Sequence, residues 1–185
     1  DKILGLTLSP NAIKNQKDLV FVYTPIHGTG GQIITRLFKK AGFSNFHTVE
    51  EQMVIDGNFP TVVSPNPEEK AALTLAIEKA KEIDADVVLA TDPDADRVGI
   101  AVRDNDGEFV LLNGNQTAAL LTYYLLTRWN ELGKLSGKEY IVKTIVTTEL
   151  LFDIANKYNV AKFDVLTGFK FIADKILNNP GMTFI

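Results

Sequence analysis

The sequence contains no cysteine among its 185 residues. This excludes a disulfide scaffold, a thiolate zinc site, an iron–sulfur cluster and a cysteine nucleophile. No apolar run approaches the roughly 18–20 residues needed to cross a bilayer, and no basic, apolar leader opens the chain. Low-complexity tracts are also missing, and the 45% hydrophobic and 23% charged content is that of an ordinary globular protein. We therefore expect a soluble, cytoplasmic protein with no membrane partner.

The charge balance is mildly acidic. Nineteen Lys and Arg stand against 23 Asp and Glu, for a formal net charge of −4. This argues against nucleic acid as a partner, because an extended phosphate backbone attracts basic surfaces. A net negative charge is still compatible with local basic sites on the surface. The length favours two small domains, which we place at residues 1–106 and 107–185.

The first half alternates short apolar strands with amphipathic helices. Its periodicity predicts strands at 18–23, 46–50 and 85–90, and helices at 32–41 and 67–83. The β–α–β–α–β order predicts a mostly parallel sheet that is covered by helices. The turn Asp106-Gly107 predicts a hairpin between strands at 98–103 and 108–112.

The second half repeats this order of elements, although not the residues themselves. The predicted elements are helices at 115–131, 148–158 and 170–177, and strands at 140–146, 162–166 and 182–185. We therefore expect the α/β class, with two consecutive three-layer α/β/α domains whose sheets are mixed and mostly parallel. The last strand corresponds to 85–90, and the sequence ends before the loop that would follow it, so part of a site is expected to be missing.

The densest chemical signal is Thr91-Asp92-Pro93-Asp94-Ala95-Asp96-Arg97, directly after the strand at 85–90. Alternate residues of an extended loop can face one way, which would aim the three carboxylates at one point. Their repulsion exceeds what Arg97 can offset, so a cation is expected there. Oxygen-only ligands favour Mg²⁺, Mn²⁺ or Ca²⁺, and open coordination positions suit Mg²⁺ shared with a phosphate. The alternative is a solvated acidic turn.

A second candidate is the loop His27-Gly28-Thr29-Gly30-Gly31, between a strand and a helix. Its backbone N–H groups could face an anion, or the glycines could simply serve a tight turn. We expect His27 and Gly28 to support the residues that contact the ligand and not to contact it themselves, because a lone histidine is more often a structural hydrogen-bonding group.

The second half contributes possible sugar or phosphate contacts. Lys143 lies inside the apolar strand at 140–146, so it either lies on an exposed edge or points into a cleft. Thr167-Gly168-Phe169-Lys170 joins a strand to a helix and offers hydroxyl, N–H and ammonium donors. No serine has a convincing base beside it, and Ser64 fits the polar entry to the helix at Pro67.

At these residues the sequence resembles the α-D-phosphohexomutase family, and within it the bacterial α-phosphoglucomutases and phosphomannomutases. The stretches that carry the resemblance are Tyr23-Thr24-Pro25-Ile26-His27-Gly28-Thr29-Gly30, Asp56-Gly57-Asn58-Phe59-Pro60 with Asn66-Pro67-Glu68, Asp92-Pro93-Asp94-Ala95-Asp96-Arg97, and Thr167-Gly168-Phe169-Lys170. The resemblance implies an intramolecular phosphotransferase, an isomerase of carbohydrate metabolism. Such an enzyme has four domains and interconverts hexose 1-phosphate and hexose 6-phosphate through a phosphoserine and a bisphosphorylated sugar.

The resemblance also implies roles for individual residues. Asp92, Asp94 and Asp96 would hold Mg²⁺ together with the phosphoserine phosphate, and Arg97 would be a catalytic contact to that phosphate or to the substrate. The substrate-binding residues would be Lys143, Thr167, Gly168 and Lys170. Glucose is the leading hexose, although Phe169 stands where some relatives carry histidine or tryptophan, which leaves the sugar preference open.

Several family pieces are absent from these 185 residues: the phosphoserine loop Thr-Ala-Ser-His-Asn-Pro, the Gly-Glu-Glu-Ser sugar loop and the C-terminal phosphate-binding domain. The resemblance therefore implies the second domain and most of the third. Its partners would be the hexose phosphate and the N- and C-terminal domains of the same polypeptide, and we expect the chain alone to be inactive. The alternatives are a Mg²⁺-dependent phosphatase with an aspartate nucleophile in Asp92-Pro93-Asp94, or a non-catalytic module that binds metal or sugar phosphate.

Overall fold

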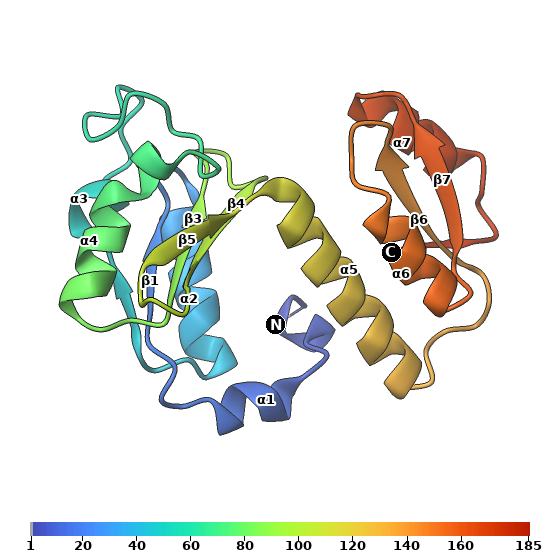
Figure 1. Cartoon of the computed structure of the whole chain (residues 1–185), viewed down its shortest axis with the longest axis horizontal. Coiled ribbons are helices and arrows are strands. Elements are labelled where there is room, and N and C mark those ends of the chain that lie inside the picture. Colours follow the sequence, from blue (N-terminus) through green and yellow to red (C-terminus); the bar gives the residue numbers. More distant parts are fainter. Residues whose placement is uncertain (1) are drawn as a thin grey trace. The chain divides into compact units, whose positions relative to one another are not determined.

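The chain separates into two compact units, Asp1–Gly114 and Asn115–Ile185 (Figure 1). The computed structural model describes residues 2–185. Within this range no helix is both long and apolar enough to span a membrane.

The first unit is built on a five-stranded sheet with the order β2-β1-β3-β4-β5. The strands are β1 (Phe21–Thr24), β2 (Phe46–Thr48), β3 (Val87–Thr91), β4 (Val98–Arg103) and β5 (Phe109–Leu112). β2, β1 and β3 run parallel, while β3, β4 and β5 are antiparallel, which confirms the predicted mixed sheet and its hairpin. The unit extends past residue 106, where we expected a boundary, because β5 pairs with β4.

Helices of this unit partly follow the sequence prediction. They are η1 (Leu4–Leu6), α1 (Pro10–Asn15), α2 (Gly30–Ala41), α3 (Glu50–Met53), η2 (Lys70–Leu73) and α4 (Thr74–Glu82). α2 ends at Gly42, whose left-handed φ of 102° closes the helix. The helix predicted at 67–83 begins only at residue 70, and the strand predicted at 46–50 stops at Thr48 because Glu50 opens α3.

β1 shows that helices cover both faces of the sheet. Phe21 and Tyr23 point to one face, where both rings pack edge-on against Phe38 of α2, at 5.1 and 5.6 Å between ring centroids. Val22 points to the other face and joins a buried cluster that contains Ala76 of α4. Because neighbouring strand residues face opposite ways, α2 and α4 lie on opposite sides and the unit has three layers.

The second unit has a three-stranded parallel sheet with the order β7-β6-β8. Its elements are α5 (Gly114–Glu131), β6 (Glu139–Thr144), α6 (Leu150–Lys157), β7 (Ala161–Val165), α7 (Phe169–Leu177) and β8 (Thr183–Phe184). In both units the first strand lies between the second and the third, so the repeated element order is also a repeated topology. Ile141 packs with Leu126 and Leu151 of the flanking helices.

Candidate functional site

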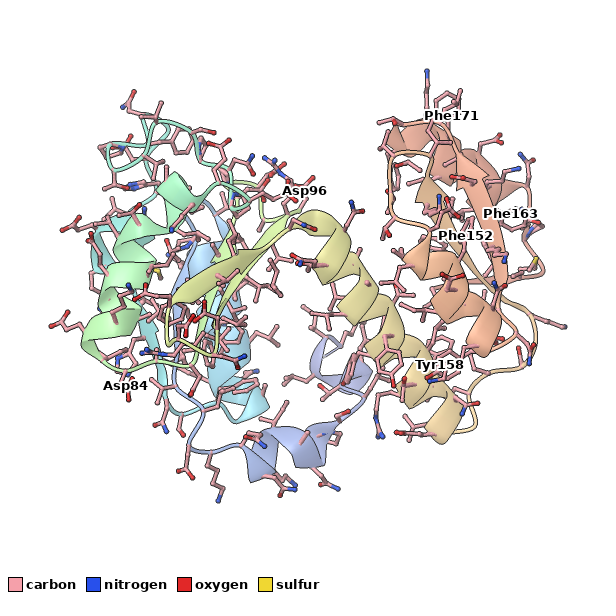
Figure 2. All side chains as sticks on the ribbon, viewed as in Figure 1. Asp84, Asp96, Phe152, Tyr158, Phe163 and Phe171 are labelled. Atoms are coloured by element: carbon pink, nitrogen blue, oxygen red, sulfur yellow. The ribbon has the colours of Figure 1, made fainter. Side chains whose placement is uncertain are left out.

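The acidic loop follows β3, the middle strand of the first sheet, and leads into β4. One carboxylate oxygen from each of Asp92, Asp94 and Asp96 lies within 4.8 Å of the others. Asp92 is buried, whereas Asp94 and Asp96 are exposed; Asp96 is labelled in Figure 2. The structure therefore brings together the three carboxylates singled out in the sequence, and their oxygens could hold one hard cation.

Asp92 is the anchor of this loop. Its side chain accepts a hydrogen bond from the backbone N–H of Arg97 at Oδ1 (3.0 Å) and another from Arg97 Nε at Oδ2 (2.8 Å). Burial acts to raise the pKa of Asp92, but the hydrogen bonds from Arg97 outweigh it, so the pKa lies below its usual value. The buried carboxylate is therefore held in its charged form.

Asp96 has the opposite shift. Its hydrogen bond to Asp92 and the negative charge of Asp94 raise the pKa of Asp96 above the ordinary value. The cause is crowding of like charges, which a divalent cation between the carboxylates would relieve. The donor set and its electrostatics thus fit a hard metal ion.

Arg97 is oriented from a second side by Asn66. Arg97 Nη1 donates to Asn66 Oδ1 at 3.3 Å, so the guanidinium spans Asp92 and the turn that contains Asn66. This turn approaches β4 closely: a Cβ on Gly99 would lie 2.1 Å from the carbonyl oxygen of Pro67. The sequence predicts no role for Asn66, which is marked there only by its place in a stretch that resembles the family.

The glycine-rich loop lies against the acidic loop. Both the backbone N–H and the hydroxyl of Thr29 donate to the carbonyl oxygen of Pro93, at 2.8 and 3.0 Å. His27 is buried beside it, with Nδ1 bonded to the Val54 carbonyl oxygen at 2.9 Å and Nε2 to Thr61 Oγ1 at 2.8 Å. Both ring nitrogens are thus engaged within the protein, as for a structural hydrogen-bonding histidine.

In the second unit Lys143 is buried at 3% exposure on the middle strand β6, so the exposed-edge alternative is wrong. Its ammonium pairs with Glu149 at 2.8 Å and Asp164 at 3.1 Å, and lies 4.6 Å from the centre of the Phe152 ring. The pKa of Lys143 is raised, mainly by the hydrogen bond to Glu149. Burial acts in the opposite direction but is outweighed. The ammonium is therefore charged and already neutralised by two carboxylates.

The loop 167–170 joins β7 to α7. Gly168 has φ 129°, a value that favours glycine, and it precedes the first residue of α7. Lys170 is exposed on the first turn of that helix, with Nζ 4.9 Å from the centre of the Phe171 ring. The helix begins one residue earlier than predicted, at Phe169. Thr167 and Lys170 are open to solvent, unlike Lys143.

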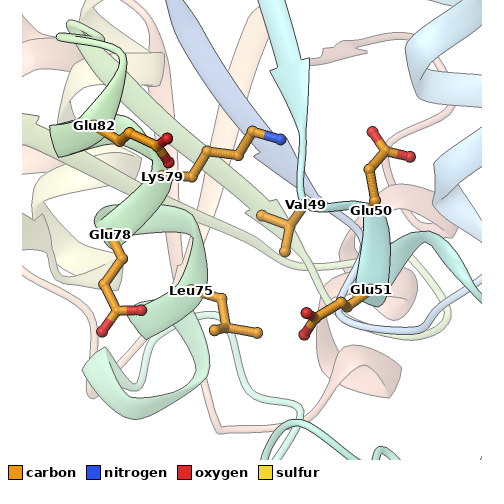
Figure 3. A pocket seen from close by; sticks show the side chains of 7 residues that line it. All are labelled: Val49, Glu50, Glu51, Leu75, Glu78, Lys79 and Glu82. Atoms are coloured by element: carbon orange, nitrogen blue, oxygen red, sulfur yellow. The ribbon is translucent and has the colours of Figure 1, made fainter.

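An open cavity of about 340 Å³ lies elsewhere, between α3 and α4 (Figure 3). It is lined by Val49, Glu50, Glu51, Leu75, Glu78, Lys79 and Glu82. Lys79 is tied to the sheet there, because its Nζ donates to the Thr48 carbonyl oxygen at 2.7 Å. The cavity contains none of the candidate site residues.

Fold and loop together define an α/β protein with clustered oxygen ligands at the carboxyl end of a central parallel strand. The family profile described as "Phosphoglucomutase/phosphomannomutase, alpha/beta/alpha domain II" matches residues 4–107, and the profile for domain III matches residues 113–184. The chain therefore belongs to the phosphoglucomutase/phosphomannomutase family, the α-D-phosphohexomutases, and holds its domains II and III.

Curated relatives agree with this assignment. The chain is 42% identical over 156 residues to a "Probable phosphomannomutase" of Haemophilus influenzae, covering 84% of this chain and 31% of that protein. It is 42% identical over 161 residues to a "Phosphoglucomutase" of Staphylococcus aureus, covering 87% of this chain and 28% of that protein. The chain thus spans about 30% of the length of these relatives.

Solved structures share the fold. A phosphoglucomutase/phosphomannomutase family protein of Burkholderia thailandensis superposes with a TM-score of 0.69 at 23% identity, over 96% of this chain and 36% of that chain. An N-acetylphosphoglucosamine mutase of Aspergillus fumigatus, solved in complex with GlcNAc-6P and magnesium, gives a TM-score of 0.61 at 17% identity, over 92% of this chain and 36% of that chain.

Proposed function

We propose that this chain supplies the metal-binding face and part of the sugar-phosphate-binding face of a Mg²⁺-dependent phosphohexomutase. The reaction interconverts hexose 1-phosphate and hexose 6-phosphate through a phosphoserine and a bisphosphorylated sugar, with glucose as the leading hexose. The observation that carries the proposal is the convergence of Asp92, Asp94 and Asp96 within 4.8 Å. The names of the relatives, phosphoglucomutase and phosphomannomutase, support the reaction class.

The acidic loop suits Mg²⁺ because all its ligands are carboxylate oxygens and two of the three side chains face solvent. When bound, Mg²⁺ would neutralise negative charge on phosphoryl oxygens. Asp92 is fixed by Arg97, which sets the position of one ligand before the metal arrives. Asp94 and Asp96 are exposed, and Asp96 would exchange its hydrogen bond to Asp92 for the ion.

Arg97 and the loop 167–170 are the proposed contacts to phosphate and sugar. The guanidinium of Arg97 is half-exposed and already oriented by Asp92 and Asn66, so binding a phosphate costs it little side-chain entropy. Lys170 is exposed and can reach an anion directly. Lys143 can do so only by giving up Glu149, because its ammonium is buried between two carboxylates.

An aspartyl phosphatase is a weaker reading of the same loop. A nucleophilic carboxylate needs an accessible oxygen, but Asp92 is 1% exposed and each of its oxygens accepts a hydrogen bond from Arg97. The geometry is that of an anchoring side chain. Phosphorylation of the chain at Asp92 by a small phosphate donor would reverse this reading.

The test combines metal binding and turnover on the 185-residue chain. Competition between Mg²⁺ and Mn²⁺, followed by water-proton relaxation, is expected to show one site whose affinity falls about tenfold or more in D94N. An assay with glucose 1-phosphate and a bisphosphorylated glucose primer is expected to give no glucose 6-phosphate, because the sequence holds no phosphoserine loop. Absence of the metal site would overturn the proposed role of the loop, and turnover would overturn the proposed need for further domains.

A further inference from the structure

The turn that follows β1 is both buried and strained. Ile26 and His27 have φ values of 47° and 61°, in the left-handed region that favours glycine. Ile26 is fully buried and His27 is 3% exposed. A β-branched residue in this conformation persists only where the surrounding structure holds it. The turn is therefore held in place by its surroundings, and the contacts that hold it can be identified.

A chain of buried and half-buried hydrogen bonds provides that support. Thr24 Oγ1 donates to Gln52 Oε1 at 2.6 Å, and Gln52 Nε2 donates to Thr61 Oγ1 at 3.0 Å. The Thr61 hydroxyl is also hydrogen-bonded to His27 Nε2, at 2.8 Å. His27 Nδ1 must donate to the Val54 carbonyl oxygen, 2.9 Å away, because a carbonyl only accepts. Both ring nitrogens are thus bonded inside the protein, which holds the position of the His27 ring.

The far side of this turn touches the backbone of the acidic loop. Thr29 donates to the Pro93 carbonyl oxygen through its N–H at 2.8 Å and through its hydroxyl at 3.0 Å. A Cβ on Gly28 would lie 2.4 Å from Pro93 Cα, so only glycine allows this approach. Pro93 lies between Asp92 and Asp94. Displacement of its backbone would therefore move the carboxylates on both sides of it.

We infer that residues 25–29 are the rigid support of the acidic loop, and that Gly28 and Thr29 are positioning residues for its carboxylates. Three like charges that converge within 4.8 Å repel one another, so the loop backbone must be held for them to stay together. Asp92 is held from the Arg97 side, and Pro93 is held by Thr29. The expectation that these residues affect metal affinity rests on the proposed function, whereas the expectation that they keep the loop rigid does not.

The experiment compares four variants and the wild-type 185-residue chain. G28A places a methyl group against Pro93, T29V removes one hydrogen bond to Pro93 with little change in shape, and T29S restores the hydroxyl. The control is G5A, because a Cβ on Gly5 meets nothing within 4 Å. The two measurements are the Mn²⁺ dissociation constant from water-proton relaxation and amide hydrogen exchange at Ala95 in the metal-free chain. Ala95 is the reporter because its N–H donates to the Asp92 carbonyl oxygen at 3.0 Å inside the loop.

Residues behind metal ligands typically change metal affinity by roughly 10–100-fold when they are replaced. We expect about tenfold or greater weakening of Mn²⁺ binding in G28A. In T29V we expect about threefold, the effect of losing one hydrogen bond, with T29S and G5A close to wild type. Ala95 exchange should accelerate in G28A and T29V and stay unchanged in the other two, while thermal melts report any global loss of stability separately. A purely structural role would lower the melting temperature without the selective change at Ala95.

The inference is overturned if T29V binds Mn²⁺ and exchanges Ala95 as the wild type does. If G28A fails to fold, Mn²⁺ binding and Ala95 exchange in T29V alone test the inference. Failure of the wild-type chain to bind Mn²⁺ would count against the proposed function instead, and Ala95 exchange in the metal-free variants would still decide whether residues 25–29 support the loop.

Discussion

Arg97 holds both carboxylate oxygens of Asp92, with its backbone N–H on Oδ1 at 3.0 Å and its Nε on Oδ2 at 2.8 Å. The pair closes the acidic loop at its base, where Asp92 is buried. A buried carboxylate without its partners would carry the full cost of its lost hydration. Arg97 is therefore required for the loop before any ligand is present.

Replacing Arg97 with methionine is expected to lower the free energy of unfolding at pH 7 by about 2 kcal/mol, because the charged Asp92 side chain loses a hydrogen bond from a cation. Folding lowers the pKa of Asp92, so this stabilisation is present above the unfolded-state pKa and is lost as the pH falls through the folded-state value. The difference between R97M and wild type should therefore shrink in acid.

Urea unfolding at a series of pH values measures this difference. A matched control is K81M, which removes the exposed Lys81–Glu108 pair and should change stability by less than about 0.5 kcal/mol. An equal loss in R97M at neutral and acidic pH would show that the guanidinium acts through packing and not through the charge of Asp92.

Glu139 gives the second unit its own acid sensitivity. Burial acts to raise its pKa, but hydrogen bonds from the Ser136 hydroxyl, the Ser136 N–H and the Gly137 N–H outweigh this and lower the pKa from 4.5 to about 2. The unit should therefore keep this stabilisation above pH 4.5 and lose it between pH 4.5 and 2. E139Q should cost on the order of 2 kcal/mol at pH 7 and show a flatter acid profile.

The fluorescence of Trp129, the single tryptophan, reports unfolding of this unit because it lies in α5. The control is E131Q, since Glu131 lies in the same unit and is exposed at the end of α5. An acid profile of E139Q that matches wild type between pH 4.5 and 2 would contradict the assignment.

Gly99 should not tolerate a side chain. A Cβ at this position would lie 2.1 Å from the Pro67 carbonyl oxygen, so either β4 or the turn containing Asn66 must shift. G99A is expected to lower the free energy of unfolding by about 1–3 kcal/mol, as for other overpacked positions. The companion variant G57A meets nothing within 4 Å and should melt like wild type. Equal melting temperatures for G99A and wild type would contradict the close approach.

The sequence predicts the strands and the acidic loop well because both are local signals. The apolar run around Val22 and the carboxylates after β3 can be identified from adjacent residues. The start of the helix predicted at 67 was wrong because Glu69 is extended, with φ −97° and ψ 124°, and separates the turn that begins at Asn66 from η2.

Contacts between residues far apart in the sequence cannot be predicted from such local signals. Gln52 is fully buried because Thr24 and Thr61 satisfy its amide, and these partners lie 28 and 9 positions away. Lys143 lies in an apolar strand because Glu149 and Asp164, on separate elements, pair with its ammonium. Nothing in the residues next to Gln52 or Lys143 specifies those partners, so their environments emerge only in the fold.

The most direct test of the metal site is site-resolved Mn²⁺ binding by NMR on the 185-residue chain. We predict that low Mn²⁺ broadens most strongly the amide signals of Asp92, of residues 94–97 and of the adjoining Gly28 and Thr29, that Mg²⁺ restores them, and that D94N weakens the effect about tenfold or more. D106N is the matched control, because Asp106 is an exposed acid in the turn between β4 and β5. Broadening spread over all acidic surfaces, or equal broadening in D94N, would contradict the account.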